Sequence, residues 1–312
     1  SPYLVSSTRK HPLDFSEIKG QLKLKRAVEV AVAGGHNLLM LGPPGSGKSM
    51  VAKRIPSILP PPTLDEYLEV LNIFSIGGLS SSLHGNGMGR PIRCPHHTIS
   101  DVGLLGGGTK PGPGEISLAH NGILFMDELP EFKRSALEVL RQPLEEQQIL
   151  ISRAKYSEIF PANFMLIAAM NPCPCGYYNH PEKECICPGG SVQKYLNKIS
   201  GPLLDRIDLH VEVTPVSFDE LSNSKPGEKS TLIRERVIKA REIQTNRYRH
   251  SKKTHSNAQM NSSHLENSCF LSEECKYLLK NAMNKLDLSA RAYNRILKVS
   301  RTIADLDGLH SI

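Results

Sequence analysis

The chain has 312 residues, and its 39% hydrophobic and 22% charged residues are typical of a soluble globular protein. Its length allows one large α/β domain and a smaller one. The apolar runs are too short to span a bilayer and the N-terminus has no signal-peptide core, so we expect a cytoplasmic protein without a membrane partner. The net charge of +7 and the pI of about 9.0 favour an anionic partner such as nucleic acid, although an ordinary solvated surface gives the same excess.

The first predicted elements surround a glycine-rich loop. A helix is expected from about Gln21 to Ala33, and the apolar run over 37–41 predicts a buried strand. The next eight residues read GPPGSGKS, a complete P-loop of the form G-x-x-x-x-G-K-[ST], and residues 50–55 have helix-forming composition. A strand, a glycine-rich turn and the N-terminus of a helix together direct backbone N–H groups at a phosphate chain. The alternative is a fortuitous Gly/Pro turn, which would need neither the strand nor the helix.

This loop predicts ATP and Mg²⁺ as cofactors. Lys48 is expected to reach the β- and γ-phosphates, and the Ser49 hydroxyl is expected to ligate Mg²⁺. The predicted nucleotide-binding residues are Gly42, Pro43, Pro44, Gly45, Ser46, Gly47, Lys48, Ser49 and Met50.

A second helix is predicted from Thr63 to about Phe74. The region that follows, residues 77–119, is dense in Gly and Pro. So much backbone freedom favours a functional insertion made of mobile loops, and we expect no regular element there.

Two adjacent carboxylates, Asp127 and Glu128, end the next apolar run, residues 123–126. With an intact P-loop upstream, this pattern predicts a Walker B strand: Asp127 holds Mg²⁺ through water, and Glu128 polarises the attacking water. The alternative is that both residues only cap the helix that begins after Pro130. A glutamate at this position indicates ATP hydrolysis rather than ATP binding alone.

Further strands follow. Apolar and β-branched residues over 149–160 predict a hairpin, and residues 163–170 predict a buried strand that ends at Asn171. Strands and helices that alternate around a P-loop predict an α/β fold, with a parallel sheet covered by helices on both faces.

Four of the seven cysteines lie in a loop over residues 172–190. They form two C-x-C pairs: Cys173, Cys175, Cys185 and Cys187. Four thiolates can converge on one tetrahedral Zn²⁺, so the loop is a candidate structural zinc site, with His180 as an alternative ligand. The spacing is tighter than the common C-x₂-C, and free buried thiols or a redox-labile loop remain alternatives.

The character of the chain changes at Pro215. Beyond it, helical patterns cover residues 230–247, 272–286 and 289–305. The polar stretch over 245–268 is expected to form an exposed, poorly ordered loop. We therefore divide the chain into an α/β core over residues 1–215 and a small helical domain over residues 216–312.

Several longer motifs add a resemblance to a known family. They read CPHHTISDVGLLGGG, PGPGEISLAHNGILFMDELPEF, NPCPCG, GPLLDRIDLHVEV and LSARAYNRILKVSRTIADL. With the P-loop, they resemble the magnesium-chelatase-like AAA+ ATPases, and within these the competence protein ComM (YifB) group. The resemblance covers about residues 14–308. Members of that group carry a Lon-protease-like domain ahead of the ATPase, so we expect this chain to correspond to the ATPase core.

The resemblance implies a P-loop AAA+ core with a C-terminal helical lid, and it adds three catalytic residues. Asn171 matches the sensor-1 position, which orients the attacking water, unless it only forms an Asx-type cap. Arg206 matches the arginine finger, which stabilises transition-state charge across a subunit boundary, unless it pairs with Asp205 or Asp208 on the surface. Arg291 matches sensor 2, which presents a guanidinium to the phosphates from the lid, unless it too only forms a surface ion pair.

The resemblance also implies partners. A finger arginine works only from a neighbouring subunit, so a homo-hexameric ring is expected. In ring translocases, loops such as 77–119 and 149–160 line a central pore. Residues there that would hold a DNA backbone are Arg90, Arg93, His96, His97, Lys110, Arg153 and Lys155.

The function that the resemblance implies is a Mg²⁺-dependent ATPase that moves DNA, as a helicase or branch-migration motor in natural transformation and recombination. The same motifs would serve a chelatase-like or protein-remodelling ATPase with a protein substrate. A nucleotide-gated scaffold that hardly turns over is the third reading, which the presence of Glu128, Asn171 and Arg206 opposes.

Overall fold

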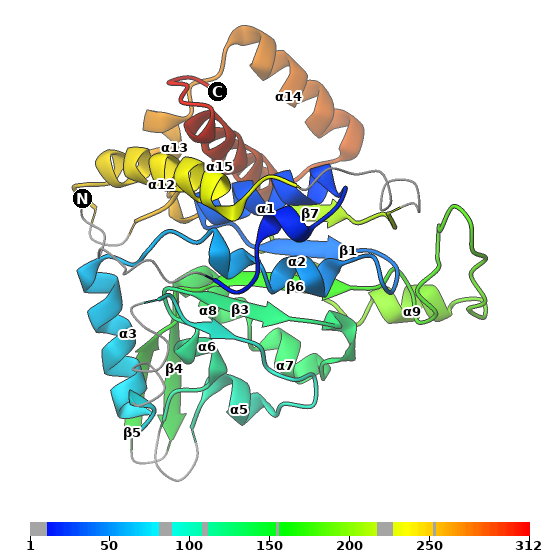
Figure 1. Cartoon of the computed structure of the whole chain (residues 1–312), viewed down its shortest axis with the longest axis horizontal. Coiled ribbons are helices and arrows are strands. Elements are labelled where there is room, and N and C mark those ends of the chain that lie inside the picture. Colours follow the sequence, from blue (N-terminus) through cyan, green and yellow to red (C-terminus); the bar gives the residue numbers. More distant parts are fainter. Residues whose placement is uncertain (1–10, 81–88, 108–111, 154–155, 217–226, 252–253) are drawn as a thin grey trace.

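The computed structural model describes residues 11–80, 89–107, 112–153, 156–216, 227–251 and 254–312 (Figure 1). Its main sheet has five parallel strands in the order β2-β3-β6-β1-β7. The strands are β1 (Leu38–Leu41), β2 (Ile92–Arg93), β3 (Ile123–Met126), β6 (Met165–Met170) and β7 (Leu209–Glu212). The predicted parallel α/β sheet is therefore confirmed.

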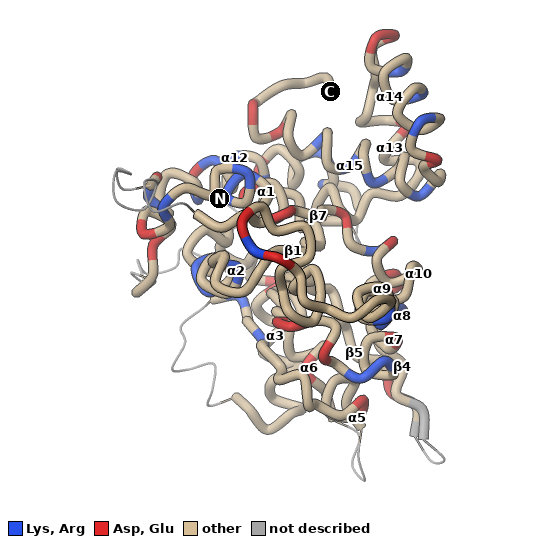
Figure 2. Tube along the Cα trace, turned by 90° about the vertical axis from the view of Figure 1, so that its right-hand side faces the viewer, with Lys and Arg blue, Asp and Glu red and all other residues tan. Residues whose placement is uncertain are grey.

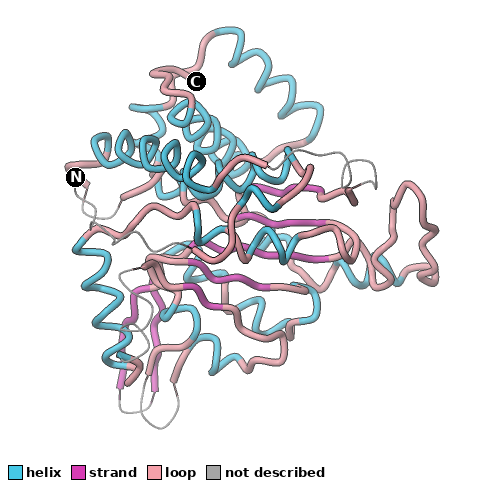
Figure 3. Tube along the Cα trace, viewed as in Figure 1, coloured by secondary structure: helices cyan, strands magenta, loops and turns pink. Residues whose placement is uncertain are grey.

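Helices cover both faces of this sheet (Figures 1 and 3). Those of the core are η1 (Phe15–Glu17), α1 (Leu22–Gly34), α2 (Lys48–Ala52), η2 (Ile55–Ser57), α3 (Leu64–Ile76), α5 (Asp101–Leu105), α6 (Glu115–Leu118), η3 (Leu129–Glu131), α7 (Arg134–Glu138), α8 (Arg141–Glu146), α9 (Ser191–Leu196) and α10 (Gly201–Leu204). The C-terminal region is helical, with α12 (Ser230–Arg247), η4 (Asn257–Gln259), α13 (Ser262–Ser268), α14 (Glu273–Leu286) and α15 (Ala290–Leu306). This is the architecture of an AAA+ core followed by a helical C-terminal domain, as the sequence predicts. In the described part of the chain, no helix has both the length and the apolar character needed to cross a membrane.

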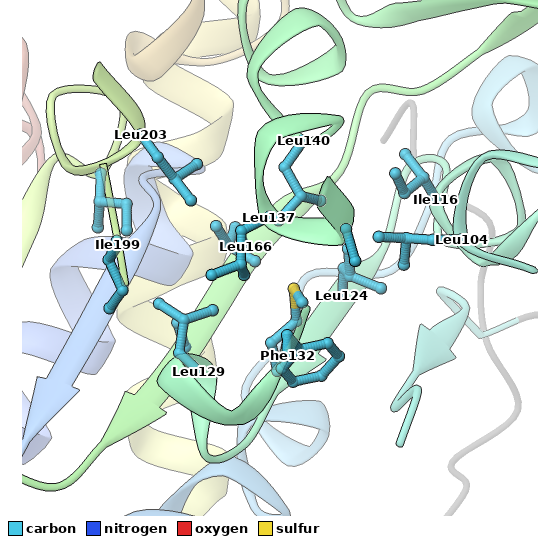
Figure 4. Packing of buried hydrophobic residues seen from close by; sticks show 14 of the residues in the cluster. Leu104, Ile116, Leu124, Leu129, Phe132, Leu137, Leu140, Leu166, Ile199 and Leu203 are labelled. Carbon is cyan, nitrogen blue, oxygen red and sulfur yellow. The ribbon is translucent and has the colours of Figure 1, made fainter. Parts of the chain in front are cut away.

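The two faces of the sheet are packed in separate hydrophobic clusters. On one face, Leu124 of β3 and Leu166 of β6 pack against Leu137 of α7 and its neighbours (Figure 4). On the other, Met40 of β1 and Ile167 of β6 pack against α1 and α12. Successive side chains of a strand point to opposite faces, so a strand covered on both sides is buried along its whole length, as all six residues of β6 are.

The register of these strands determines where the functional residues gather. Leu41 pairs with Met170, and Met126 pairs with Ala168, so β1, β3 and β6 end at the same edge of the sheet. The P-loop, Asp127 and Asn171 each follow one of these strands directly. The strand arrows in Figure 1 point to this edge, which we call the carboxyl edge.

The expectation of no regular element within residues 77–119 is wrong for the part that the structure describes. β2 is an edge strand whose Ile92 pairs with Ile123 of β3. Helix α5 begins at Ser100, whose side chain caps the N–H of Gly103. The glycine content masked a short strand and two short helices that tertiary pairing and capping stabilise.

The polar stretch over 245–268 is not a loose loop in its described residues. Asn257 is fully buried and contacts Tyr248, Thr302 and Asp305 through its side chain. Helix α13 also lies within this stretch. A buried hydrogen-bond network orders this stretch. Tyr248, Met260 and Leu265 also pack in a small hydrophobic cluster with Leu297 of α15.

The predicted hairpin over 149–160 is confirmed as β4 (Gln148–Arg153) and β5 (Tyr156–Pro161), an antiparallel pair that forms its own sheet. It projects from the main body beside α3 (Figures 1 and 3).

Candidate active site

Lys48 is at the centre of the candidate site. It begins α2 directly after the P-loop, and its side chain is buried. Its Nζ donates hydrogen bonds to the carbonyl oxygens of Gly42 and Pro43, at 2.6 and 2.8 Å, and to Oδ1 of Asn171, at 3.2 Å. Burial lowers the pKa of the Lys48 ammonium, while the charge of Asp127 acts in the opposite direction. A partly desolvated ammonium beside a glycine-rich loop is suited to holding phosphate.

The backbone of the P-loop has the conformation that its glycines allow. Gly45 and Gly47 have φ values of +74° and +93°, in the left-handed region. Ser46 is buried and its Oγ lies 3.3 Å from Nζ of Lys48. Met50 is 39% exposed beyond the loop. The loop therefore wraps around the Lys48 ammonium, which its own carbonyl groups hold.

Ser49 and Asp127 come together from α2 and the end of β3. The Ser49 hydroxyl donates a 2.6 Å hydrogen bond to Oδ2 of Asp127. A hydroxyl and a carboxylate oxygen are hard ligands of the kind that Mg²⁺ prefers. These residues therefore fit a Mg²⁺–nucleotide complex on the P-loop.

Glu128 follows Asp127 and faces more open space. Its φ is +52°, which is uncommon for a residue with a side chain and concentrates at functional turns. Its backbone N–H donates to Oδ1 of Asp127 at 3.0 Å. The carboxylate is 59% exposed and lies 3.5 Å from Nδ1 of His97. A carboxylate in this position can accept a proton from water next to a bound phosphate.

Sequence reasoning missed Gln21, which bridges the P-loop to the end of β7. Its Nε2 donates to the carbonyl oxygens of Ser46, at 3.2 Å, and Thr214, at 2.6 Å. Its backbone is left-handed, with φ +55°, and Gly20 before it has φ +60°. The Gly-Gln pair ahead of α1 was the only signal in the sequence, and a Gln there reads equally well as a helix start.

The Cys-rich loop is adjacent to the P-loop. The four Sγ atoms of Cys173, Cys175, Cys185 and Cys187 lie within 4.8 Å of one another. Three of their separations are 3.3, 3.8 and 3.6 Å, close to the roughly 3.8 Å that four sulfurs at about 2.3 Å from one tetrahedral Zn²⁺ would have. Backbone N–H groups of Gly176 and Tyr178 donate to Sγ of Cys173, and a backbone hydrogen bond at Tyr177 lowers the pKa of Cys175 to about 6. The set fits a tetrahedral metal, whereas His180 donates no ligand atom to it.

Arg206 and Arg291 lie at the other end of the sheet. Both line a cleft of about 410 Å³, together with Asn37, Met165 and Asp208, which stand at the amino ends of β1, β6 and β7. β1 alone has 4 residues, so this cleft is separated from the P-loop by at least about 13 Å along the strands. Neither arginine therefore reaches the Lys48 site of its own chain.

The Arg206 side chain pairs with Glu145 of α8, a contact that the sequence did not indicate. The alternatives weighed from the sequence, ion pairs with Asp205 or Asp208, are not formed; Asp208 instead contacts His36 at 3.0 Å. The Glu145 side chain is 59% exposed and that of Arg206 only 15%, so the pair is accessible from outside the chain on the Glu145 side. Arg291 is also exposed.

The predicted DNA-contacting residues are in different situations. Arg90 is bound to Glu66 and Arg93 is bound to Glu115 through both carboxylate oxygens, so these two arginines hold the fold together. His97 contacts Glu128, and His96 is exposed. Arg153 ends β4, while Lys110 and Lys155 lie outside the described residues. Figure 2 shows Lys and Arg interspersed with Asp and Glu over the face viewed, so the net charge alone does not locate a DNA surface.

The sheet order, the P-loop geometry and the helical C-terminal region define the class of this chain as an AAA+ P-loop protein. The chain belongs to the magnesium chelatase family: residues 14–221 match the family described as magnesium chelatase, subunit ChlI, and residues 227–312 match its C-terminal family.

The chain is also similar to individual curated proteins. It is 48% identical to the competence protein ComM of Haemophilus influenzae over 99% of this chain and 59% of that protein. It is 45% identical to the uncharacterized protein YifB of Escherichia coli over 97% of this chain and 58% of that protein. A more distant relative is the magnesium-chelatase 67 kDa subunit of Chlorobaculum parvum, 27% identical over 55% of this chain and 22% of that protein. The chain thus spans about three fifths of the length of the ComM and YifB relatives.

Proposed function

We propose that this chain is the ATP-hydrolysing core of an oligomeric motor that acts on DNA. The observation that carries the proposal is the division of the predicted catalytic residues between two edges of one sheet. Lys48, Ser49 and Asp127 gather at the carboxyl edge, whereas Arg206 and Arg291 lie in the cleft at the amino ends. Each edge holds half of a phosphoryl-transfer site.

In this proposal the residues at the carboxyl edge bind the nucleotide and activate water. Lys48 and the P-loop backbone hold the phosphates, and Ser49 and Asp127 hold Mg²⁺, which supplies neutralisation of phosphate charge when bound. Glu128 accepts the proton of the attacking water, and His97 fixes the direction of its carboxylate. Asn171, already hydrogen-bonded to Lys48, orients the water beside the γ-phosphate.

The arginines complete the site of a neighbouring copy. A contact that joins the amino-end cleft of one copy to the P-loop of the next is head-to-tail, and repetition of such a contact closes into a ring when the rotation allows. The family resemblance makes a hexamer the expected ring. Arg206 leaves its exposed partner Glu145 to meet the phosphates of the neighbour.

DNA is proposed as the substrate because the ComM relative is a competence protein and because the chain has a net charge of +7. A candidate contact surface is an open cleft of about 720 Å³ between α7 and α9. The exposed cations Arg134, Lys194 and Lys198 line it, beside Phe132. Phe132 packs edge-on against His97, at 6.4 Å between ring centres, and His97 in turn contacts Glu128. A DNA phosphate bound in this cleft would therefore lie close to the His97–Glu128 pair.

The Cys cluster is proposed to hold a structural Zn²⁺. Its four sulfurs lie within 4.8 Å of one another, and two backbone N–H groups donate to Sγ of Cys173, an arrangement that suits a closed tetrahedral site. Because the loop follows Asn171 and packs on Pro44, the metal would brace the nucleotide site.

Steady-state ATP hydrolysis, measured without DNA and with single-stranded, duplex and branched DNA, tests the proposal. Glu128→Gln is the control, because it keeps the size of the side chain and removes the base. Stimulation by DNA that disappears in Glu128→Gln supports the DNA motor, with branch migration as the activity if branched DNA stimulates most. Hydrolysis that no DNA alters refutes it and favours the second candidate, a chelatase-like motor with a protein substrate, which the family match supports.

A further inference from the structure

The segment that presents Arg206 is a short turn whose backbone needs outside support. Helix α10 has only four residues, and β7 does not begin until Leu209. The last carbonyl groups of a helix lack partners within the helix, and a charged donor is a favourable partner for them. The position of Arg206 therefore depends on which groups hold the carbonyls of residues 204–207.

Arg295 of α15 supplies that support from the C-terminal helical region. Its Nη1 donates to the carbonyl oxygens of Ile207, at 2.9 Å, and Leu204, at 3.5 Å. Its Nη2 lies 3.7 Å from Oδ1 of Asp205. The guanidinium thus contacts the residues on both sides of Arg206 without touching the Arg206 side chain.

A second anchor comes from the core. The Asn37 side chain donates from Nδ2 to the carbonyl oxygen of Arg206 at 2.9 Å, while its Oδ1 accepts from the N–H of Leu166 in β6. Asn37 is fixed by the sheet, so it ties this one carbonyl group to the core, and the carbonyls of Leu204 and Ile207 are left to other donors. Arg295 is the anchor that can move with α15.

Arg295 also lies one helical turn after Arg291. Residues four apart on a helix share a face and are separated by about 6 Å along its axis. Both line the cleft that contains Arg206. A displacement of α15 would therefore move Arg291 directly and Arg206 through the carbonyls that Arg295 holds.

We propose that Arg295 is a positioning residue for Arg206: it couples α15 to the finger segment, so that the helical region of one copy sets the geometry of both arginines in the site of the next copy. The proposal rests on the proposed function, because it requires Arg206 to act on a neighbour. It assigns Arg295 to the neighbour's reaction through its contacts with the residues on both sides of Arg206.

The test is subunit mixing with the full chain, read by phosphate release. Arg295→Ala should lower kcat by about ten- to hundredfold, the effect of misplacing a catalytic group by about 1 Å, and leave binding of a fluorescent ATP analogue to the variant's own P-loop unchanged. Lys276→Ala, which removes an exposed cation of α14 paired only locally with Glu273, should retain full activity.

Mixing then separates a role in the neighbour's site from a role in the variant's own site. Arg295→Ala keeps an intact P-loop and Glu128, whereas Glu128→Gln keeps an intact Arg206 and Arg295. In an equimolar mixture, about one interface in four joins the intact P-loop and Glu128 of an Arg295→Ala subunit to the intact arginines of a Glu128→Gln subunit. Two nearly inactive variants should therefore regain about a quarter of the wild-type rate. Arg206→Ala mixed with Glu128→Gln is the reference pair.

The outcomes are distinct. Recovery in both mixtures supports the assignment of Arg295. Recovery in the reference pair without recovery in the Arg295→Ala mixture overturns it and leaves the proposed function intact. No recovery in the reference pair overturns the proposed trans site, and the assignment of Arg295 with it. If Arg295→Ala does not fold, Arg295→Lys replaces it: an ammonium cannot hold both carbonyls with the same fork, so an intermediate rate restored by mixing is expected.

Discussion

Substituting Gly176 with alanine should disturb the P-loop through a single contact. Gly176 has φ +86°, and a Cβ added there would lie 2.4 Å from Cδ and 2.7 Å from Cγ of Pro44. The left-handed backbone costs an alanine about 1–2 kcal/mol, and the overlap adds about 1–3 kcal/mol of the kind seen when a packed site is overfilled. Cδ and Cγ of Pro44 belong to its rigid pyrrolidine ring and cannot rotate away. The overlap can therefore be relieved only by moving the P-loop or the Cys cluster.

Gly190→Ala is the matched control. Gly190 has φ +77° in the same loop region, and a Cβ there meets nothing within 4 Å. Both variants therefore carry the backbone cost, and only Gly176→Ala carries the overlap. Denaturant unfolding should show Gly176→Ala less stable than Gly190→Ala by about 1–3 kcal/mol.

Nucleotide affinity is the measurement that best distinguishes Gly176→Ala from Gly190→Ala. If the P-loop moves to relieve half or more of the overlap, nucleotide binding must restore the loop and loses that share of the strain energy. The Kd of a fluorescent ATP analogue should then rise about tenfold in Gly176→Ala for each 1.4 kcal/mol of binding free energy lost, with little change in Gly190→Ala. Equal Kd values in the two variants would refute the reasoning that the Cys-rich loop supports the P-loop.

Three further predictions concern charge and metal. Burial works to raise the pKa of Glu66, but the charge and hydrogen bonds of Arg90 outweigh it and the pKa is lowered, so the pair's contribution to stability is present above the ordinary value of 4.5 and is lost as the pH falls below it. Urea unfolding from about pH 6 to about pH 3 should therefore cost the wild type more stability than Glu66→Gln, and parallel losses would contradict this. Ser49→Ala should raise the Mg²⁺ concentration needed for half-maximal hydrolysis, in a metal titration, by about tenfold, whereas an unchanged titration would remove the hydroxyl from the metal site. Metal analysis should find one zinc per chain, lost in Cys185→Ser/Cys187→Ser, and a metal-free native protein would exclude the zinc site.

The half of the candidate site around the P-loop could be predicted from sequence because it is local. GPPGSGKS specifies its own turn, and residues that end parallel strands must meet at one edge once the sheet forms. Ser49 therefore meets Asp127 in a hydrogen bond, close enough to Lys48 for the charge of Asp127 to act on its ammonium.

The other half depends on contacts that no local pattern encodes. Arg206 pairs with Glu145, which is 61 residues away in the chain. Arg295 binds the carbonyl groups of Leu204 and Ile207, which are 91 and 88 residues away. Their pairing appears only when α8, α10 and α15 are packed. The ion pairs of Arg90 and Arg93 were invisible for the same reason, since each is bound to a glutamate more than twenty residues distant; their predicted contact with DNA stays a prediction.

The polar stretch over 245–268 shows how composition misleads. Low hydrophobicity predicts disorder because an apolar core cannot form. In this case the few apolar residues of the stretch, Tyr248, Met260 and Leu265, pack with Leu297 of α15 in a small hydrophobic cluster. Asn257 and Asp305 add a buried network of hydrogen bonds, which depends on the geometry of α12 and α15 and is invisible in the composition.

The proposed ATP site is built from two copies of this chain. The most direct measurement is the rate of phosphate release per chain across a dilution series, with the oligomeric state followed by light scattering on the same samples. A shared site requires a specific activity that rises with concentration in step with assembly, and an Arg206→Ala variant that assembles and binds ATP but stays inactive at every concentration. A specific activity that remains constant down to concentrations at which the chain is monomeric would contradict it.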